Sequence, residues 1–291
     1  MQKVLYKYRA INEYTEKIFS DNEFWYSKIE SLNDPNEGMV RRVSAQLAEE
    51  FIRKTKENQL SGFIFSRVLI KDSSFFGLNK HELRNFEKQI RSKKSFDKKY
   101  NFINNFMREK TGRRFSNPEG FINSINEKIN NVGILSLSDN PLQNLLWSHY
   151  AESHSGIAVG ISGYSTDAYK KVIYNETPII PEVDLERFNS ILKIYQDHTK
   201  FEIAFNDPAL QTILLTKTVE WAYESEWRGI SETAGAYSIN GLISEIIFGL
   251  KCKEEHKQKI ISLLKANNIN AKLKQVCKKD NSYGLFLKEY K

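Results

Sequence analysis

Two glutamates stand two residues apart in residues 219–231, which read Val-Glu-Trp-Ala-Tyr-Glu-Ser-Glu-Trp-Arg-Gly-Ile-Ser. Side chains at i and i+2 of a β-strand point to the same face, so a strand here would place Glu224 and Glu226 on one side. Neighbouring carboxylates push their pKa values apart and can divide acid, base and charge-stabilising roles. The alternative is a solvated strand face on which Arg228 is a counter-ion.

The rest of the chain predicts an α+β fold around a mostly antiparallel sheet. Strands and helices interleave without regular βαβ alternation, and neither GxGxxG nor GxxxxGK[ST] occurs. We expect one α+β domain over residues 1–291, with residues 39–131 as a helical insertion. The predicted strands are residues 4–9, 24–29, 132–138, 157–161, 226–231, 243–248, 271–277 and 284–290, with 62–69 and 172–174 ambiguous. The predicted helices begin at residues 12, 118 and 140 or span 39–58, 80–110, 182–197, 207–218 and 254–266.

Composition limits the class of protein. The chain has 291 residues, 40% of them hydrophobic, which suffices for a sizeable globular core. Its two cysteines, Cys252 and Cys277, form no CxxC pair, which argues against a disulfide framework and a thiolate zinc site. No apolar run approaches the roughly 18 residues that span a membrane, and no signal peptide is evident. We therefore expect a cytoplasmic protein without membrane contact.

Positive charge is concentrated in one segment. The whole chain has a net charge of +7, whereas residues 80–114 hold twelve Lys/Arg and four Asp/Glu, a net charge of +8. A localised basic segment can steer a polyanion, so a protein or nucleic-acid acceptor is expected to bind there. A lysine-rich solvated helix has the same composition.

The histidines do not predict a metal site. The sequence has five histidines, and only His149 and His154 are close together, at a spacing that does not align on one helix face. Ser148 and His149 are adjacent, so on a helix their side chains point apart and do not form a nucleophilic pair. We expect His149 either to line the site, on its cofactor-binding side, or to lie on a helix face.

Several motifs resemble a bacterial family known only as a domain of unknown function. The match runs in order over most of the chain, except residues 39–131, and Asn36 stands where the family usually has an aromatic residue. The motifs are Tyr6-Lys7-Tyr8-Arg9, Phe24-Trp25-Tyr26-Ser27, Leu32-Asn33-Asp34-Pro35-x-Glu37, Leu146-Trp147-Ser148-His149-Tyr150-Ala151 with His154-Ser155-Gly156, Trp221-x-Tyr223-Glu224-x-Glu226-Trp227-Arg228 and Glu245-Ile246-Ile247-Phe248-Gly249.

The order of polar residues also resembles that of mono-ADP-ribosyltransferases, which use an Arg or His, then a Ser or Tyr, then a late Glu. The resemblance implies that NAD is the substrate, with Arg9 on its pyrophosphate. It further implies that Tyr26 stacks on nicotinamide and that Ser27 braces the site. Glu226 would hold the ribose hydroxyls and stabilise the oxocarbenium-like centre, and Glu224 would orient or deprotonate the acceptor.

Three functions stay open at this point. The first is an ADP-ribosyltransferase-like enzyme, of the kind that serves as a bacterial toxin or antiphage effector. The second is a nucleic-acid-binding or nucleic-acid-processing defence protein that uses residues 80–114 and the Trp/Tyr-rich motifs. The third is a non-catalytic sensor or adaptor whose motifs are structural.

Overall fold

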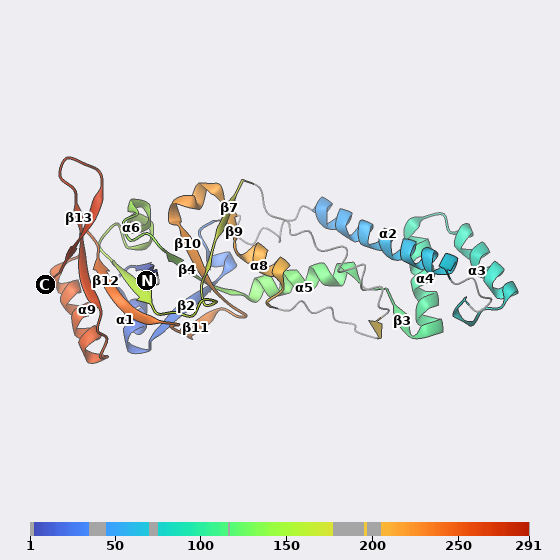
Figure 1. Cartoon of the computed structure of the whole chain (residues 1–291), viewed down its shortest axis with the longest axis horizontal. Helices are drawn as coiled ribbons and strands as arrows, with labels where there is room; N and C mark the ends of the chain where they lie inside the picture. The colour runs from blue at the N-terminus through green and yellow to red at the C-terminus, as the bar shows by residue number, and fades with distance from the viewer. Residues whose placement is uncertain are drawn as a thin grey trace. The chain divides into compact units, whose positions relative to one another are not determined.

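A computed structural model of the chain describes residues 3–34, 45–69, 75–115, 117–176, 195–196 and 205–290. The chain forms two compact units (Figure 1). Unit 1 comprises Met1–Gly38, Ile129–Ile179 and Leu214–Lys291, and unit 2 comprises Met39–Lys128 and Ile180–Ile213. Most of the helical insertion expected at residues 39–131 thus falls in unit 2, together with residues 180–213.

Unit 1 is built on a ten-stranded sheet in the order β11-β2-β4-β1-β5-β12-β13-β14, with β10 and β6 joined beside β4. All its pairings are antiparallel except β12 with β13, so the expected α+β fold with a mostly antiparallel sheet is confirmed. A second, small sheet pairs β7 (Ile173–Asn175) with β9 (Thr216–Thr218) in parallel. The strands of the large sheet are β1 (Leu5–Arg9), β2 (Glu23–Lys28), β4 (Gly133–Ser138), β5 (Ile157–Ser162), β6 (Lys170–Lys171), β10 (Glu226–Ser231), β11 (Gly235–Ser238), β12 (Leu242–Phe248), β13 (Lys272–Lys278) and β14 (Leu285–Glu289).

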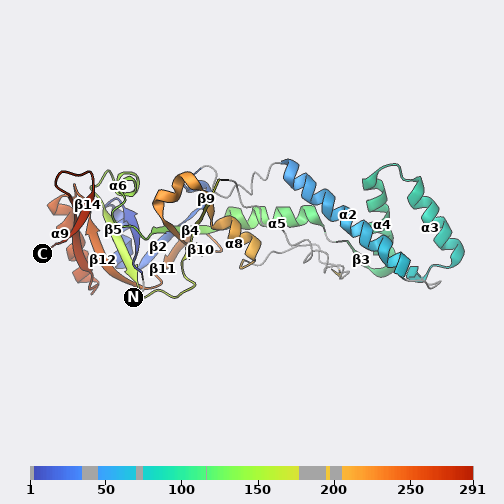
Figure 2. The same cartoon turned by 45° about the horizontal axis from the view of Figure 1, so that its top comes forward.

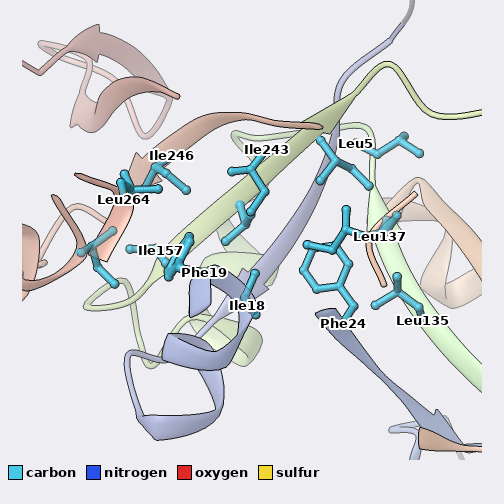
Figure 3. Packing of buried hydrophobic residues seen from close by; sticks show 14 of the residues in the cluster. Leu5, Ile18, Phe19, Phe24, Leu135, Leu137, Ile157, Ile243, Ile246 and Leu264 are labelled. Atoms are coloured by element: carbon cyan, nitrogen blue, oxygen red, sulfur yellow. The ribbon is translucent and has the colours of Figure 1, made fainter. Parts of the chain in front are cut away.

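Helices cover both faces of this sheet. Helices α1 (Glu13–Ser20) and α9 (Glu254–Ala266) pack on one face, where Phe19 and Leu264 lie near Ile157 and Ile246 in a cluster that also includes Leu5 and Leu137 (Figure 3). Helix α6 (Asn144–Tyr150) packs on the other face through Leu146 and Trp147. In both views α9 lies beside strands β12 to β14 (Figures 1 and 2). Alternation along each strand therefore decides which helix layer a side chain meets.

Strand β4 positions the functional residues because it pairs along both edges. On one edge β10 pairs with it throughout, from Glu226 opposite Ser138 to Ser231 opposite Gly133. On the other edge β1 pairs only at Ser138, and β2 pairs only near Gly133. These registers place Glu226 on the α6 face of the sheet.

Unit 2 is mainly helical. A cluster of aromatic rings around Phe63 fills its core, and α2, α3 and α4 lie side by side around that core (Figures 1 and 2). Asn79 caps α3 through a capping box with Glu82, and Gly112, with φ of 68°, ends α4. The elements are α2 (Ala45–Leu69), a 3₁₀ turn at Phe75–Gly77, α3 (Lys80–Ser92), α4 (Phe96–Thr111), β3 (Arg113–Arg114), α5 (Pro118–Asn131, whose last residues belong to unit 1), β8 (Tyr195–Gln196) and α8 (Pro208–Leu214).

The structure corrects several local expectations. Residues 62–69 continue α2 instead of forming a strand, because Leu60 and Phe63 pack on the α3 and α4 layer at helical spacing. The helix expected over residues 207–218 ends at Leu214, and Thr216–Thr218 form β9. Helix α6 begins at Asn144 and not at residue 140. Of the helix expected at 182–197 only Tyr195–Gln196 are described, as a strand, and residues 35–38 of the expected turn lie outside the described residues.

No helix among the described residues is long and apolar enough to cross a lipid bilayer.

Candidate functional site

The two glutamates lie on either side of a sharp turn and not on one strand. Glu224 ends the 3₁₀ helix η4 (Val219–Glu224), Ser225 adopts a left-handed conformation with φ of 46°, and Glu226 begins β10. The hydroxyl of Ser138 donates to the Glu224 carbonyl at 2.6 Å and fixes the turn against β4. The expectation that the i and i+2 positions of a strand align the carboxylates is therefore wrong. Both carboxylates nevertheless bond to the same lysine.

Lys217 joins the two carboxylates. Its Nζ donates to Oε2 of Glu224 at 2.7 Å and to Oε2 of Glu226 at 3.1 Å. The side chains are almost fully buried, with 4% of Lys217, 6% of Glu224 and 2% of Glu226 exposed. The same ammonium lies 4.8 Å from the centroid of the Trp221 ring. The ammonium of a buried lysine thus bridges two carboxylates beside an aromatic ring.

Arg228 keeps the carboxylate of Glu226 ionised at neutral pH. Its Nε and Nη2 donate to the two carboxylate oxygens of Glu226 at 2.9 and 3.1 Å, and its Nη1 donates to the carbonyl of Leu214 at 2.7 Å. Burial favours the neutral carboxyl, but Arg228 and Lys217 outweigh it and hold the pKa of Glu226 at about 2. The backbone N–H of Glu226 donates to the hydroxyl of Tyr174 at 2.7 Å. Both carboxylate oxygens of Glu226 therefore take part in ion pairs.

Glu224 faces a chain of polar groups that leads outward. The hydroxyl of Tyr150 donates to its Oε1 at 2.7 Å, and Nδ2 of Asn33 donates to that hydroxyl at 2.9 Å. Burial, and then the charge of Glu224, raise the pKa of Tyr150. Next to them, Thr218 Oγ1 donates to the buried carboxyl of Asp34 at 3.5 Å. Oε1 of Glu224 thus accepts from a neutral hydroxyl, whereas both carboxylate oxygens of Glu226 accept from cationic side chains.

Lys7 is a further titratable group beside this network. Its Nζ donates to the carbonyl of Ser136 at 3.0 Å, and the hydroxyl of Ser136 bonds to Glu226. Burial and the charge of Arg9 lower the pKa of Lys7 to about 8, while the charges of Glu226 and Glu224 oppose that shift. Its ammonium therefore loses its proton at a lower pH than that of an ordinary lysine.

The other expected site residues are placed differently. Tyr26 packs on the α1 and α9 face, edge-on to Tyr237 with ring centroids 5.0 Å apart, so the structure does not bring it to the glutamates. Ser27 pairs with Ile134 of β4, a register that puts it on the α6 face. Arg9 ends β1 opposite Ile157, and burial lowers the pKa of its guanidinium. His149 is exposed on α6, next to Tyr150.

Residues 146–229 match the model of a family described as "Protein of unknown function (DUF2971)". Over these residues the match confirms the expected resemblance to a family of unknown function. It includes Tyr150, Lys217, Glu224, Glu226 and Arg228, whereas Lys7, Asn33, Asp34 and Ser136 lie outside the matched region. No curated protein and no solved structure matches the chain.

Sequence reasoning did not name Lys217, Tyr150, Asn33 or Lys7 as site residues. Lys217 lies in an apolar run that predicts only a helix, and nothing in its neighbours marks it as buried. Tyr150 and Asn33 belong to motifs of the family resemblance, which was the only signal for them. Within the described ranges, no group of three His, Cys, Asp or Glu side chains is arranged to hold a metal ion.

Proposed function

We propose that the protein is an enzyme of the ADP-ribosyltransferase kind, which cleaves the N-glycosidic bond of NAD and transfers ADP-ribose to a protein or nucleic-acid acceptor. The observation that carries this proposal is the pair of buried glutamates that share the ammonium of Lys217. When nicotinamide leaves NAD, positive charge develops on the ribose, and a fixed carboxylate stabilises it. A chain with such a pair beside aromatic residues has the parts that this chemistry needs.

The ion pairs support different roles for the two carboxylates in this proposal. Glu226 is locked by Arg228 and Lys217, so in this proposal it positions Lys217 and fixes the local charge. Glu224 needs only to release the hydroxyl of Tyr150 to receive a ribose hydroxyl or a proton from an acceptor. We therefore assign the central role to Glu224 and the supporting role to Glu226, the reverse of the order expected from sequence.

Aromatic rings beside Glu224 supply a place for a planar base. The rings of Trp221 and Tyr223 lie 6.0 Å apart, and both side chains are partly exposed. In this proposal they take the stacking role that the resemblance gave to Tyr26, because Tyr26 is in the core. Arg9 pairs opposite Ile157 of the α1 and α9 face, yet its charge acts on Lys7 beside the glutamates, so the proposal keeps it as the cation for the pyrophosphate. His149 is an exposed residue of α6 beside Tyr150. Consumption of NAD would suit the cytoplasmic toxin or antiphage role that the resemblance suggests.

The test is release of nicotinamide from labelled NAD, with and without protein and nucleic-acid acceptors. Glu224→Gln should lower the rate by roughly 10²–10⁴-fold, the usual contribution of a positioned acid or base. The matched control is Glu220→Gln, an exposed glutamate of the same 3₁₀ helix, which should retain the wild-type rate. If the wild type releases no nicotinamide, labels no acceptor and shows no thermal shift with NAD, the proposal fails.

A second candidate function is nucleic-acid binding through unit 2. Most basic side chains of α3, α4 and the segment between them are exposed to solvent and so are able to contact a phosphate backbone. These exposed residues include Lys80, Arg84, Lys88, Arg91, Lys94, Lys98, Arg108 and Lys110. The two functions are compatible if the acceptor of ADP-ribose is a nucleic acid. A non-catalytic sensor would instead keep its cellular effect after Glu224→Gln.

A further inference from the structure

A serine and a histidine meet on the surface of unit 1 beyond the glutamate network. Oγ of Ser148, exposed on α6, lies 3.4 Å from Nε2 of His154. Sequence reasoning considered only the adjacent Ser148 and His149, whereas the chain turns back to bring His154 to the serine. The ring of His154 stacks on the buried Trp147, with centroids 6.2 Å apart and 16° between the ring planes.

An unusual turn holds His154 in place. Glu152, Ser153 and His154 all have left-handed backbones, with φ of 48°, 52° and 73°. Such conformations are costly for residues other than glycine, and they persist where surrounding contacts fix them. The N–H of His154 donates to the carbonyl of Trp147 at 3.1 Å, and the carbonyl of His154 accepts the N–H of Lys251 at 2.9 Å. The imidazole is thus fixed in position.

The Ser148–His154 pair lacks the third member of a nucleophilic triad. In such triads a carboxylate accepts the N–H of Nδ1 and orients the ring. Nδ1 of His154 is buried without a hydrogen-bond partner among the described residues. If the neutral ring carries its proton on Nε2, no N–H is buried at Nδ1. The Nε2–H and the hydroxyl of Ser148 are then two neighbouring hydrogen-bond donors. Two donors at a surface suit the binding of an anion better than they suit general-base catalysis.

Two lysines make this location electropositive. Lys251 follows the turn after β12 and is bonded to His154 through its backbone, and Lys278 ends β13. Nε2 of Gln275 donates to the carbonyl of Gly249 at 2.8 Å, which ties β13 to the same turn. Burial and then the charges of Lys251 and Lys278 lower the pKa of His154. In the described part of the chain neither lysine forms an ion pair with a carboxylate.

We propose that Ser148, His154, Lys251 and Lys278 form a binding site for phosphate groups. The hydroxyl and the imidazole N–H would donate to phosphate oxygens, and the two ammonium groups would supply the compensating charge. The alternative is that the two lysines are only solvated surface residues. That alternative explains neither the three left-handed residues nor the histidine fixed beside a serine.

The experiment follows the imidazole of His154 by NMR in the full-length protein at low ionic strength, with inorganic pyrophosphate as the probe. A bound anion stabilises the imidazolium, so pyrophosphate should raise the pKa of His154. Lys251→Ala should weaken pyrophosphate binding by about tenfold, since it removes one charge-assisted contact. Lys253→Ala is the matched control: it removes an exposed lysine of the same loop that pairs with Glu255 at 3.7 Å, and binding should be unchanged.

Further arms identify the source of the phosphate. A shift of the His154 signal with NAD assigns the site to the dinucleotide, and a shift only with a short single-stranded oligonucleotide assigns it to a nucleic acid; either supports the site. The proposal is overturned if pyrophosphate leaves the pKa of His154 unchanged, or if Lys251→Ala and Lys253→Ala weaken binding equally. Release of nicotinamide is a separate measurement, so the two proposals can fail independently.

Discussion

At the scale of single residues, Glu224 and Glu226 differ in what would remain if each were neutralised. Without the charge of Glu226, the buried guanidinium of Arg228 loses the carboxylate that accepts from its Nε and Nη2, although the Leu214 carbonyl still accepts from Nη1. Without the charge of Glu224, Lys217 still has Glu226, and the hydroxyl of Tyr150 still meets an amide oxygen. The structure therefore places two cationic side chains on Glu226 and one on Glu224.

This difference predicts unequal effects on stability. Glu226→Gln should lower the free energy of unfolding by about 3–5 kcal/mol, the usual cost of breaking a buried ion pair. Glu224→Gln should cost no more than about 1–2 kcal/mol, because its hydrogen bonds survive in part. Chemical denaturation of the two variants and the wild type measures both values, and equal losses would contradict the assignment of roles.

The same ion pair predicts an acid-sensitive fold. The pKa of Glu226 falls from 4.5 to about 2 on folding, so the unfolded chain binds more protons between these values. Stability from this group is complete above pH 4.5 and is lost as the pH falls toward 2. The integrated effect is about 3 kcal/mol. Denaturation midpoints between pH 5 and pH 2 should fall more steeply for the wild type than for Glu226→Gln, and parallel curves would refute the cause.

Lys7 should give a pH dependence of the same sign in a higher pH window. Its pKa falls from 10.5 to about 8 on folding, so the unfolded chain binds more protons between these values and stability rises with pH across that window. Lys7→Met should flatten the rise, as measured by chemical denaturation between pH 7.5 and pH 10.5. A variant that keeps the wild-type slope would remove Lys7 as the titrating group. Lys3→Met is a suitable control, because Lys3 is largely exposed.

Sequence reasoning at this scale identified the glutamates and not their partners. The spacing of Glu224 and Glu226 marked them directly, and Arg228 was considered only as the counter-ion of a solvated strand face. Lys217 could not be found, because it reaches the pair from β9, the strand that precedes the 3₁₀ helix η4. Tyr26 was placed by residue type alone, whereas its side of the sheet depends on the register of β2 with β4.

At the scale of elements, the turn at Ser225 decides how the carboxylates meet. Its left-handed backbone, with φ of 46°, connects η4 to β10. Ser225→Val should destabilise the protein by about 1–2 kcal/mol, because a β-branched residue resists this conformation. Ser225→Gly should be tolerated, because glycine adopts it freely. Thermal unfolding of the pair tests this, and similar melting temperatures would contradict the role of the turn.

Elements with a strong periodic pattern were foreseen, and those fixed by tertiary contacts were not. Strand β1 and helix α9 follow from alternation and from 3.6-residue spacing, and Asn12 caps α1 where the sequence suggested. Strand β9 was missed because its three residues extend an apolar helical run, and they become a strand by pairing with β7. Strand β11 was missed because it is short and only half-buried, and its pairing with β2 defines it.

At the scale of the whole molecule, two cores predict two unfolding transitions. The sheet of unit 1 and the aromatic cluster of unit 2 share no residues. Glu226→Gln should lower only the transition of unit 1. Phe63→Ala should lower only that of unit 2, by about 3–5 kcal/mol, because Phe63 is buried among Phe75, Phe86 and Phe115. Differential scanning calorimetry resolves the two, and a single transition that moves with both variants would show that the units unfold together.

The charge distribution predicts where a polyanion binds. The excess positive charge of the chain is in residues 80–114, so a nucleic acid should bind unit 2 and its affinity should fall with salt. A variant with Lys88, Arg91, Lys94 and Lys98 changed to Ala should lower the slope of log K against log salt by about 0.7–0.9 for each phosphate that it no longer neutralises. The control changes four exposed lysines of unit 1, Lys17, Lys28, Lys265 and Lys272, which removes the same charge. If the slope falls equally in both variants, the protein responds to net charge alone and the basic segment is only a solvated surface. A decrease confined to the first variant would place the nucleic acid on the basic segment 80–114.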